Sequence, residues 1–325
     1  MNFSTLQGLT IPEGVVTQIA DASGRVLWMM SGGPVILEVE KITATTYAGE
    51  TSYADEQFIL LDIYPKTNGT VIVTYGGLTK TITDTSGAAK PNTQQVFFGT
   101  FNGVADSVET PASGTLTIEG GYSGFAVGVY EENSKSSNKY CGCITDVIDF
   151  GSIRDIRDNA FNGCTSLALT SLPSGITSIG FGAFRGCTSL ALTALPDGIT
   201  SIENYAFSEC TNLALTALPD GITSIGAYAF FECTNLALTT LPDSITSIGS
   251  SAFYKCENIT VNKMPSGMTA IPDSCFSYCT KVNAGTFDYT GITTIGENAF
   301  YNSSFTVLEL RLPEGVVSIG EDAFY

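Results

Sequence analysis

The side chains best suited to chemistry in this chain are its nine cysteines, most of which recur at one fixed interval. Thiols can bind metal ions, form disulfides or carry redox reactions. Only Cys143 and Cys275 stand outside the repeating set. The other seven, called here the cysteine ladder, follow one another at steps of 23 residues: Cys141, Cys164, Cys187, Cys210, Cys233, Cys256 and Cys279.

The spacing of the cysteine ladder favours packing over these kinds of chemistry. Zinc sites typically use two close cysteine pairs, often with histidine, but the chain has no histidine and one Cys-x-Cys pair, at Cys141 and Cys143. On neighbouring rungs of a repeat the Cβ vectors run parallel, which opposes the torsion that a disulfide needs. We therefore expect a column of small, buried, reduced side chains that fills one narrow corner.

The composition excludes further classes of function. Without histidine, the chain cannot use Ser-His or Cys-His catalysis or histidine metal sites. It also has no phosphate loop, nucleotide fingerprint or calcium loop. The net charge of −18, from 14 Lys and Arg against 32 Asp and Glu, repels phosphate backbones, so nucleic-acid binding is not expected. We predict a protein that is not an enzyme and that holds no cofactor or metal.

A second group of residues varies at positions where the surrounding sequence is almost copied. The residue after a repeated phenylalanine is aromatic in several copies, Tyr205 and Tyr228 share another offset, and Phe181 and Tyr278 lie close by in sequence. Drift on a solvated face is one interpretation, and a row of exposed aromatic contacts is the other. The candidate ligand-binding residues are Phe231, Tyr254, Tyr301, Tyr205, Tyr228 and Arg185.

A repeated motif, I-T-S-I-G-x-x-A-F, must position these residues. Its phenylalanine recurs at regular intervals through half of the chain. Its apolar positions follow neither a steady alternation nor a 3.6-residue period, which indicates short extended pieces joined by tight corners. One such unit buries too little apolar surface to fold alone, so the copies must stack. The phenylalanine recurs at steps of 23 and then 24 residues: Phe161, Phe184, Phe207, Phe230, Phe253, Phe276, Phe300 and Phe324.

The string L-A-L-T-A-L-P-D-G-I-T-S-I-G-A-Y-A-F-F-E-C, from Leu213 to Cys233, resembles the BspA-type, or treponemal, class of leucine-rich repeat. The resemblance covers residues 138–325 and includes the L-P corner, the I-G-x-x-A-F run and the Phe-x-x-Cys pair. It implies a surface-displayed protein that adheres to host or matrix components, without shared catalytic residues. The predicted fold is mainly β, with a leucine-rich-repeat solenoid of about eight 23-residue repeats at residues 141–325.

The residues before the repeats predict a different module. Residues 34–132 contain seven apolar runs at intervals of about ten residues, which favours a β-sandwich. The segment from Gly69 to Ile82 resembles bacterial immunoglobulin-like modules, and polar residues 133–140 are the expected linker. The runs are Val35 to Val39, Phe58 to Tyr64, Thr70 to Tyr75, Leu78 to Ile82, Val96 to Phe101, Leu116 to Ile118 and Phe125 to Tyr130.

Residues 1–33 predict a short hairpin that must dock on something, because an isolated hairpin is marginal in water. We expect this segment to anchor the protein, as a homo-oligomer or as part of a virion. The sequence has neither a secretory signal nor an apolar run long enough to span a membrane. The expected function is display at the cell surface or outside the cell, where the repeats bind an extracellular glycan or protein. The alternative is a phage or prophage virion protein, a tail or decoration part whose array is a spacer or a host-attachment module.

Overall fold

The computed structural model describes residues 144–150, 153–305 and 312–325, together with the backbone of ten strands between residues 18 and 127. Two of these strands, β1 (Gln18–Ala20) and β2 (Val26–Met29), pair antiparallel as the predicted hairpin. Its expected role as an anchor stays a prediction.

The next nine strands form two antiparallel sheets, of order β10-β4-β7-β8 and β11-β3-β9-β5-β6. Seven of these strands overlap the predicted apolar runs, β10 only at residues 125–127, whereas β8 and β11 fall outside the runs. Their assignment to an immunoglobulin-like sandwich and the predicted domain boundaries stay predictions, and the linker at residues 133–140 lies outside the described residues. The bounds are β3 (Val35–Val39), β4 (Phe58–Pro65), β5 (Thr70–Tyr75), β6 (Leu78–Thr83), β7 (Gln94–Phe101), β8 (Val104–Ala105), β9 (Gly114–Gly120), β10 (Tyr122–Val127) and β11 (Ile144–Asp149).

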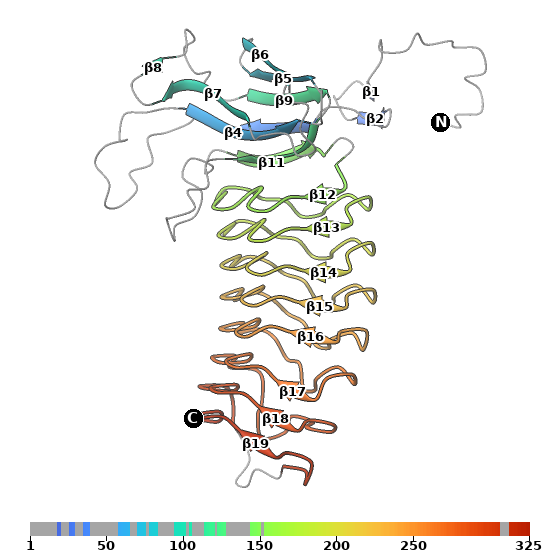
Figure 1. The fold of residues 1–325 in the computed structure, drawn as a ribbon, viewed down its shortest axis with the longest axis vertical. Coiled ribbons are helices and arrows are strands. Elements are labelled where there is room, and N and C mark those ends of the chain that lie inside the picture. The colour runs from blue at the N-terminus through green and yellow to red at the C-terminus, as the bar shows by residue number, and fades with distance from the viewer. Residues whose placement is uncertain are drawn as a thin grey trace, which may run out of the picture.

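From residue 153 onward the chain winds into coils that stack along one axis (Figure 1). Each coil contributes one two-residue strand, and these strands pair parallel and in register within three groups, β12-β13, β14-β15-β16 and β17-β18-β19, for example Ile202 beside Ile225. This arrangement confirms the predicted repeat array of short parallel strands. The strands are β12 (Asp155–Ile156), β13 (Ser178–Ile179), β14 (Ser201–Ile202), β15 (Ser224–Ile225), β16 (Ser247–Ile248), β17 (Ala270–Ile271), β18 (Thr294–Ile295) and β19 (Ser318–Ile319).

The core of the array is a set of columns, because equivalent residues of successive coils lie on top of one another. In one coil Leu236, Leu238, Leu241, Ile245 and Ile248 are all buried. The repeated phenylalanines form the largest column, with neighbouring ring centroids 5.4 to 5.7 Å apart and nearly parallel planes along most of its length. Each ring from Phe184 to Phe300 thus buries both faces against neighbouring coils, which explains why the phenylalanine is repeated so strictly.

The glycine of the repeated I-G pair allows neighbouring coils to approach closely. A Cβ atom built on Gly249 would collide with the backbone of Ala227, and one built on Gly226 would collide with the backbone of Asn204. Only a residue without a side chain fits such an approach without a shift of the backbone. The glycine is therefore repeated for packing between coils.

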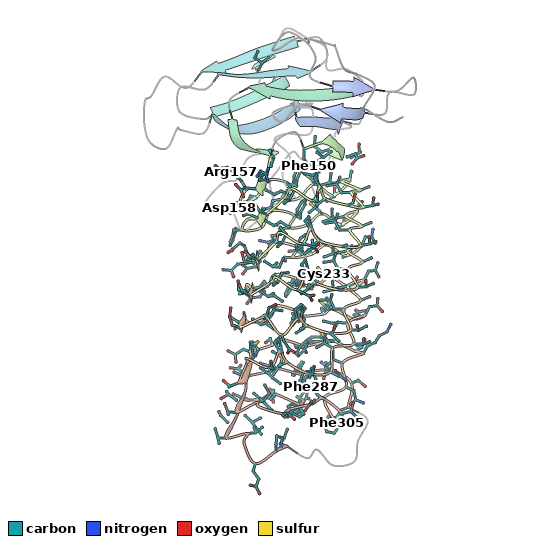
Figure 2. All side chains as sticks on the ribbon, turned by 90° about the vertical axis from the view of Figure 1, so that its right-hand side faces the viewer. Phe150, Arg157, Asp158, Cys233, Phe287 and Phe305 are labelled. Carbon is teal, nitrogen blue, oxygen red and sulfur yellow. The ribbon has the colours of Figure 1, made fainter. Side chains whose placement is uncertain are left out.

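The cysteine ladder lies inside the stack, as Cys233 shows in Figure 2. All six described members are buried and free of disulfides, as is Cys275, while Cys141 and Cys143 lie outside the described residues. Five thiols also donate a hydrogen bond to the phenylalanine carbonyl of the preceding coil, which the sequence did not indicate. The Sγ to oxygen distances are 2.9 to 3.0 Å for Cys187, Cys210, Cys233, Cys256 and Cys279.

We expect thiol counting to reveal this burial directly. After denaturation without reductant, about nine thiols should react with a chromogenic reagent, the number of cysteines in the chain. Before denaturation, at most the two cysteines outside the described residues should react rapidly, because a buried thiol is protonated and inaccessible. Several disulfides in the intact protein, or rapid reaction of more than two thiols, would contradict the packing interpretation.

Candidate functional site

Each coil turns sharply on both sides of its repeated phenylalanine. The residues two positions before and two positions after this phenylalanine both have a positive φ, for example 57° at Tyr228 and 59° at Glu232. Glycine occupies such positions at Gly182 and Gly186, where φ is 57° and 72°. The two left-handed residues fold the A-F-x-x segment into a narrow corner. The side chains of Tyr228 and Glu232 there are half-buried, whereas the neighbouring Ala229 and Cys233 are buried in the core.

At this corner aromatic residues from four sequence offsets around the repeated phenylalanine form one continuous row, called here the aromatic strip. It contains Phe181, Tyr205, Tyr228, Phe231, Tyr254, Tyr278, Tyr301 and Tyr325, eight rings on seven successive coils. Successive ring centroids along the strip are 5.6, 4.8, 5.7, 4.8, 5.3, 5.6 and 5.1 Å apart.

The rings of the strip are less open to water than the sequence suggested. Phe181 is 37% exposed and Tyr325 is 74% exposed, but the other six rings are half-buried. Each ring covers part of the next one, so an interpretation in which all of them simply face water is wrong. The strip is a partly desolvated aromatic surface, which is the kind of surface that contributes most to protein binding.

The ring contacts along the strip are of two kinds, stacked and tilted. Tyr205 and Tyr228 are stacked with an angle of 3° between their planes, and Phe231 and Tyr254 are stacked with an angle of 7°. Between these pairs, Tyr228 and Phe231 are tilted by 54°. A stacked pair covers one face of each of its rings, and the tilted contact between Tyr228 and Phe231 covers more of both, so little of these ring faces is open to solvent.

Charged residues border the strip. Arg185 lies over the ring of Tyr205, with its guanidinium carbon 5.4 Å from the ring centroid, and pairs with Glu209 at 3.1 Å between Nη2 and Oε1. Lys255 pairs with Glu232 at 3.0 Å between Nζ and Oε1. Both ion pairs connect adjacent coils and are partly exposed to solvent, so each contributes little to stability. They nevertheless neutralise the two cations beside the strip.

Burial also affects the tyrosine hydroxyls. Desolvation raises the pKa of Tyr205, and the neighbouring Tyr228 raises it further. The pKa values of Tyr254 and Tyr301 are raised by the same cause, with contributions from Tyr278 in both cases. Because a neutral tyrosine is already the form present at physiological pH, these hydroxyls can donate hydrogen bonds to a ligand.

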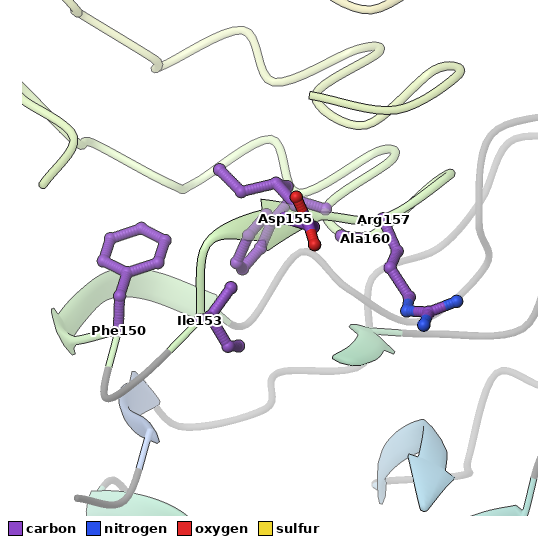
Figure 3. Close-up of a pocket in the computed structure, with 7 residues that line it drawn as sticks. Phe150, Ile153, Asp155, Arg157 and Ala160 are labelled. Atoms are coloured by element: carbon purple, nitrogen blue, oxygen red, sulfur yellow. The ribbon is translucent and has the colours of Figure 1, made fainter. Parts of the chain in front are cut away.

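Elsewhere in the described chain the structure shows a small pocket. The pocket in Figure 3 lies at the start of the array between Phe150, Ile153 and Ile156 and has room of about 10 Å³, which is too small for more than one water molecule. Within residues 144–150, 153–305 and 312–325 no group of cysteines and carboxylates is placed to hold a metal ion. No helix in this part of the chain is long and apolar enough to cross a membrane.

The structure brings together all six candidate binding residues. Arg185 lies over the ring of Tyr205. Tyr228, which shares the repeat position of Tyr205, contacts Phe231, which shares the repeat position of Tyr254 and Tyr301. Phe181 and Tyr278 complete the row. The cysteine ladder takes no part in this surface. The sequence did not indicate that Tyr205, Tyr228 and Tyr278 adopt left-handed backbone conformations.

Short parallel strands stacked at a 23-residue period, with columns of leucine, isoleucine and phenylalanine inside, define a leucine-rich-repeat solenoid. Residues 133–216 and 211–325 match the BspA type leucine rich repeat region in six copies, so the chain belongs to the BspA-type leucine-rich-repeat family. No curated protein matches the chain in sequence.

Several solved structures are similar to it. A leucine rich repeat protein of T. pallidum is 30% identical over 61% of this chain and 78% of that protein, with a TM-score of 0.41. A leucine-rich repeat protein of Bacteroides ovatus is 23% identical over 61% of this chain and 51% of that one, with a TM-score of 0.45. A leucine rich cell surface protein of Faecalibacterium prausnitzii is 27% identical over 62% of this chain and 48% of that one, with a TM-score of 0.37.

Proposed function

We propose that this protein is a non-enzymatic binding protein displayed outside the cell, and that it attaches to an extracellular partner through the aromatic strip. The observation that carries the proposal is the unbroken row of eight part-exposed rings along seven coils. Aromatic residues are enriched at binding hot spots, and a solenoid offers them an extended, rigid face. The cell surface protein of F. prausnitzii, which is similar to this chain, supports display at a surface.

The backbone at the strip supports the same proposal. Tyr205, Tyr228 and Tyr278 have φ values of 57° to 59°, a conformation that costs a bulky residue about 1 kcal/mol or more. The fold itself does not require aromatic residues there. Gly182 and Ser251 occupy the position of Tyr205 and Tyr228 in neighbouring coils, and Gly186 and Lys255 occupy the position of Tyr278 in other coils. Tyrosine is therefore retained at a cost to stability, which is typical of residues kept for contact with a ligand.

A triple variant tests the strip. We expect Phe231→Ser, Tyr254→Ser and Tyr301→Ser together to abolish attachment to target cells. Because these rings are half-buried and stacked, the variant should also lose roughly 1 kcal/mol per ring, a moderate fall in melting temperature rather than none. Flow cytometry of labelled protein on cells measures attachment, and circular dichroism measures folding.

The matched control carries Thr193→Ser, Thr216→Ser and Thr239→Ser, three exposed positions on another side of the coils. It should bind like the parent protein. A folded triple strip variant that binds as well as the parent would overturn the proposal. It would favour the alternative, a virion protein in which the array is a spacer.

A further inference from the structure

We propose that the partner of the aromatic strip is an extended, basic segment of polypeptide, rich in lysine or arginine, and not a glycan. This inference rests on the proposed binding function and narrows it to one class of ligand. It follows from the orientation of the rings, the charges beside them and the length of the strip.

Ring orientation opposes sugar binding. A sugar ring binds an aromatic side chain by lying flat on its face, so it needs that face to be open. In the pairs Tyr205–Tyr228 and Phe231–Tyr254 the centroids are 4.8 Å apart and the planes are nearly parallel, so each ring covers a face of its partner. The half-buried rings therefore offer mainly their edges.

Exposed edges and hydroxyls suit a peptide backbone. The edge of an aromatic ring carries partial positive charge, and a protonated tyrosine donates one hydrogen bond. Both groups favour carbonyl oxygens, which an extended polypeptide presents on each of its sides. Tyrosine-rich contact surfaces of this kind are common in antibodies, where they bind protein with little loss of conformational entropy.

The charges select a cationic partner. Four carboxylates, called here the acidic fringe, each lie within four residues of a strip residue in the sequence: Glu203, Glu209, Glu232 and Asp322. Two of them act on strip residues, since the charge of Glu232 raises the pKa of Tyr254 and the charge of Asp322 raises that of Tyr301. Arg185 and Lys255 are already paired with Glu209 and Glu232, so the surface keeps a negative excess. A chain with net charge −18 also repels acidic polysaccharides and second copies of itself.

The dimensions of the strip fit a linear segment. At about 4.8 Å per coil, six steps from Phe181 to Tyr325 span roughly 29 Å. An extended chain advances about 3.3 Å per residue, so about nine residues would cover the row. The partner is thus a strand-like segment or an unfolded tail that lies along the solenoid axis.

The test uses three fluorescent 12-residue peptides in which threonine alternates with lysine, glutamine or glutamate, and a neutral and an anionic polysaccharide. By fluorescence anisotropy, the lysine peptide should bind the full chain at least tenfold more tightly than the glutamate peptide. Neither polysaccharide should compete. The triple variant at Phe231, Tyr254 and Tyr301 should lose most of this binding.

Two charge variants separate specific binding from general attraction to an acidic protein. Glu203→Gln with Asp322→Asn removes two charges from the acidic fringe, and asparagine tolerates the φ of 52° at position 322. Asp197→Asn with Asp220→Asn removes two exposed charges at another corner. The first should weaken lysine-peptide binding about threefold to tenfold, and the second should change it less than twofold.

The outcomes distinguish this inference from the proposed function. Equal losses in the two charge variants, or binding of a polysaccharide that the triple strip variant abolishes, would overturn the basic-peptide partner. In either case, loss of cell attachment by the triple strip variant would leave the proposed function standing. Unchanged cell attachment in that variant would overturn both.

Discussion

Raising the pH above 9 is expected to destabilise this protein far more than an average protein of its size. Desolvation by complete or nearly complete burial raises the pKa of five thiols above the ordinary value of 9.0: Cys210, Cys233, Cys256, Cys275 and Cys279. In the unfolded chain the same thiols ionise freely as the pH passes that value. The folded protein must then hold five protons that the unfolded chain has released.

The direction follows from proton linkage. The free energy of unfolding changes with pH in proportion to the protons bound by the unfolded state minus those bound by the folded state. That difference is negative above pH 9, so stability present at neutral pH is lost as the pH rises. Each thiol contributes about 1.4 kcal/mol by pH 10, so five thiols together should remove about 7 kcal/mol between pH 7 and pH 10.

Urea unfolding followed by circular dichroism from pH 7 to 10, in the presence of a phosphine reductant, measures this loss. Cys233→Ala is the matched variant, because it removes one thiol and leaves the other four buried. It should be less stable than the parent at pH 7, yet should lose about one fifth less stability on going to pH 10. A loss equal to that of the parent would show that the thiols are not held protonated by the fold.

The second large effect is expected from a single ring of the phenylalanine column. Phe230 is fully buried, and its ring is stacked between those of Phe207 and Phe253, 5.6 Å from each. Phe230→Ala leaves a cavity between two coils that cannot close, because their backbones are hydrogen-bonded to one another. The free energy of unfolding should fall by about 3–5 kcal/mol.

The residue that follows provides the control. Phe231 is half-buried in the aromatic strip, so Phe231→Ala removes a ring of the same size from the surface. It should cost about 1 kcal/mol, while the lysine-peptide binding described above should weaken. Chemical denaturation gives both stabilities. Equal costs at the two positions would contradict the assignment of one ring to the core and the other to the binding face.

The sequence alone was sufficient to establish the repeat array. Because phenylalanine and cysteine recur at a 23-residue step, each lies against the equivalent residue of the next coil. The buried column through Phe230 and the thiol column through Cys233 therefore followed from the spacing. The short strands also followed, because the apolar pattern allowed no long period. The hydrogen bond from Cys233 to the carbonyl of Phe207 did not follow, since it depends on where the corner places a backbone oxygen.

Only the tertiary structure decided how the variable residues meet. The period indicates that Tyr205 lies beside Tyr228 and Phe231 beside Tyr254, but it cannot tell whether the two pairs touch. They touch because Tyr228 and Glu232 adopt left-handed backbone conformations that fold the corner back on itself. In sequence such turns are recognised by glycine, and here tyrosine and glutamate take its place. The orientation of the rings, from which we infer the class of partner, therefore depends on backbone geometry that residue types alone do not reveal.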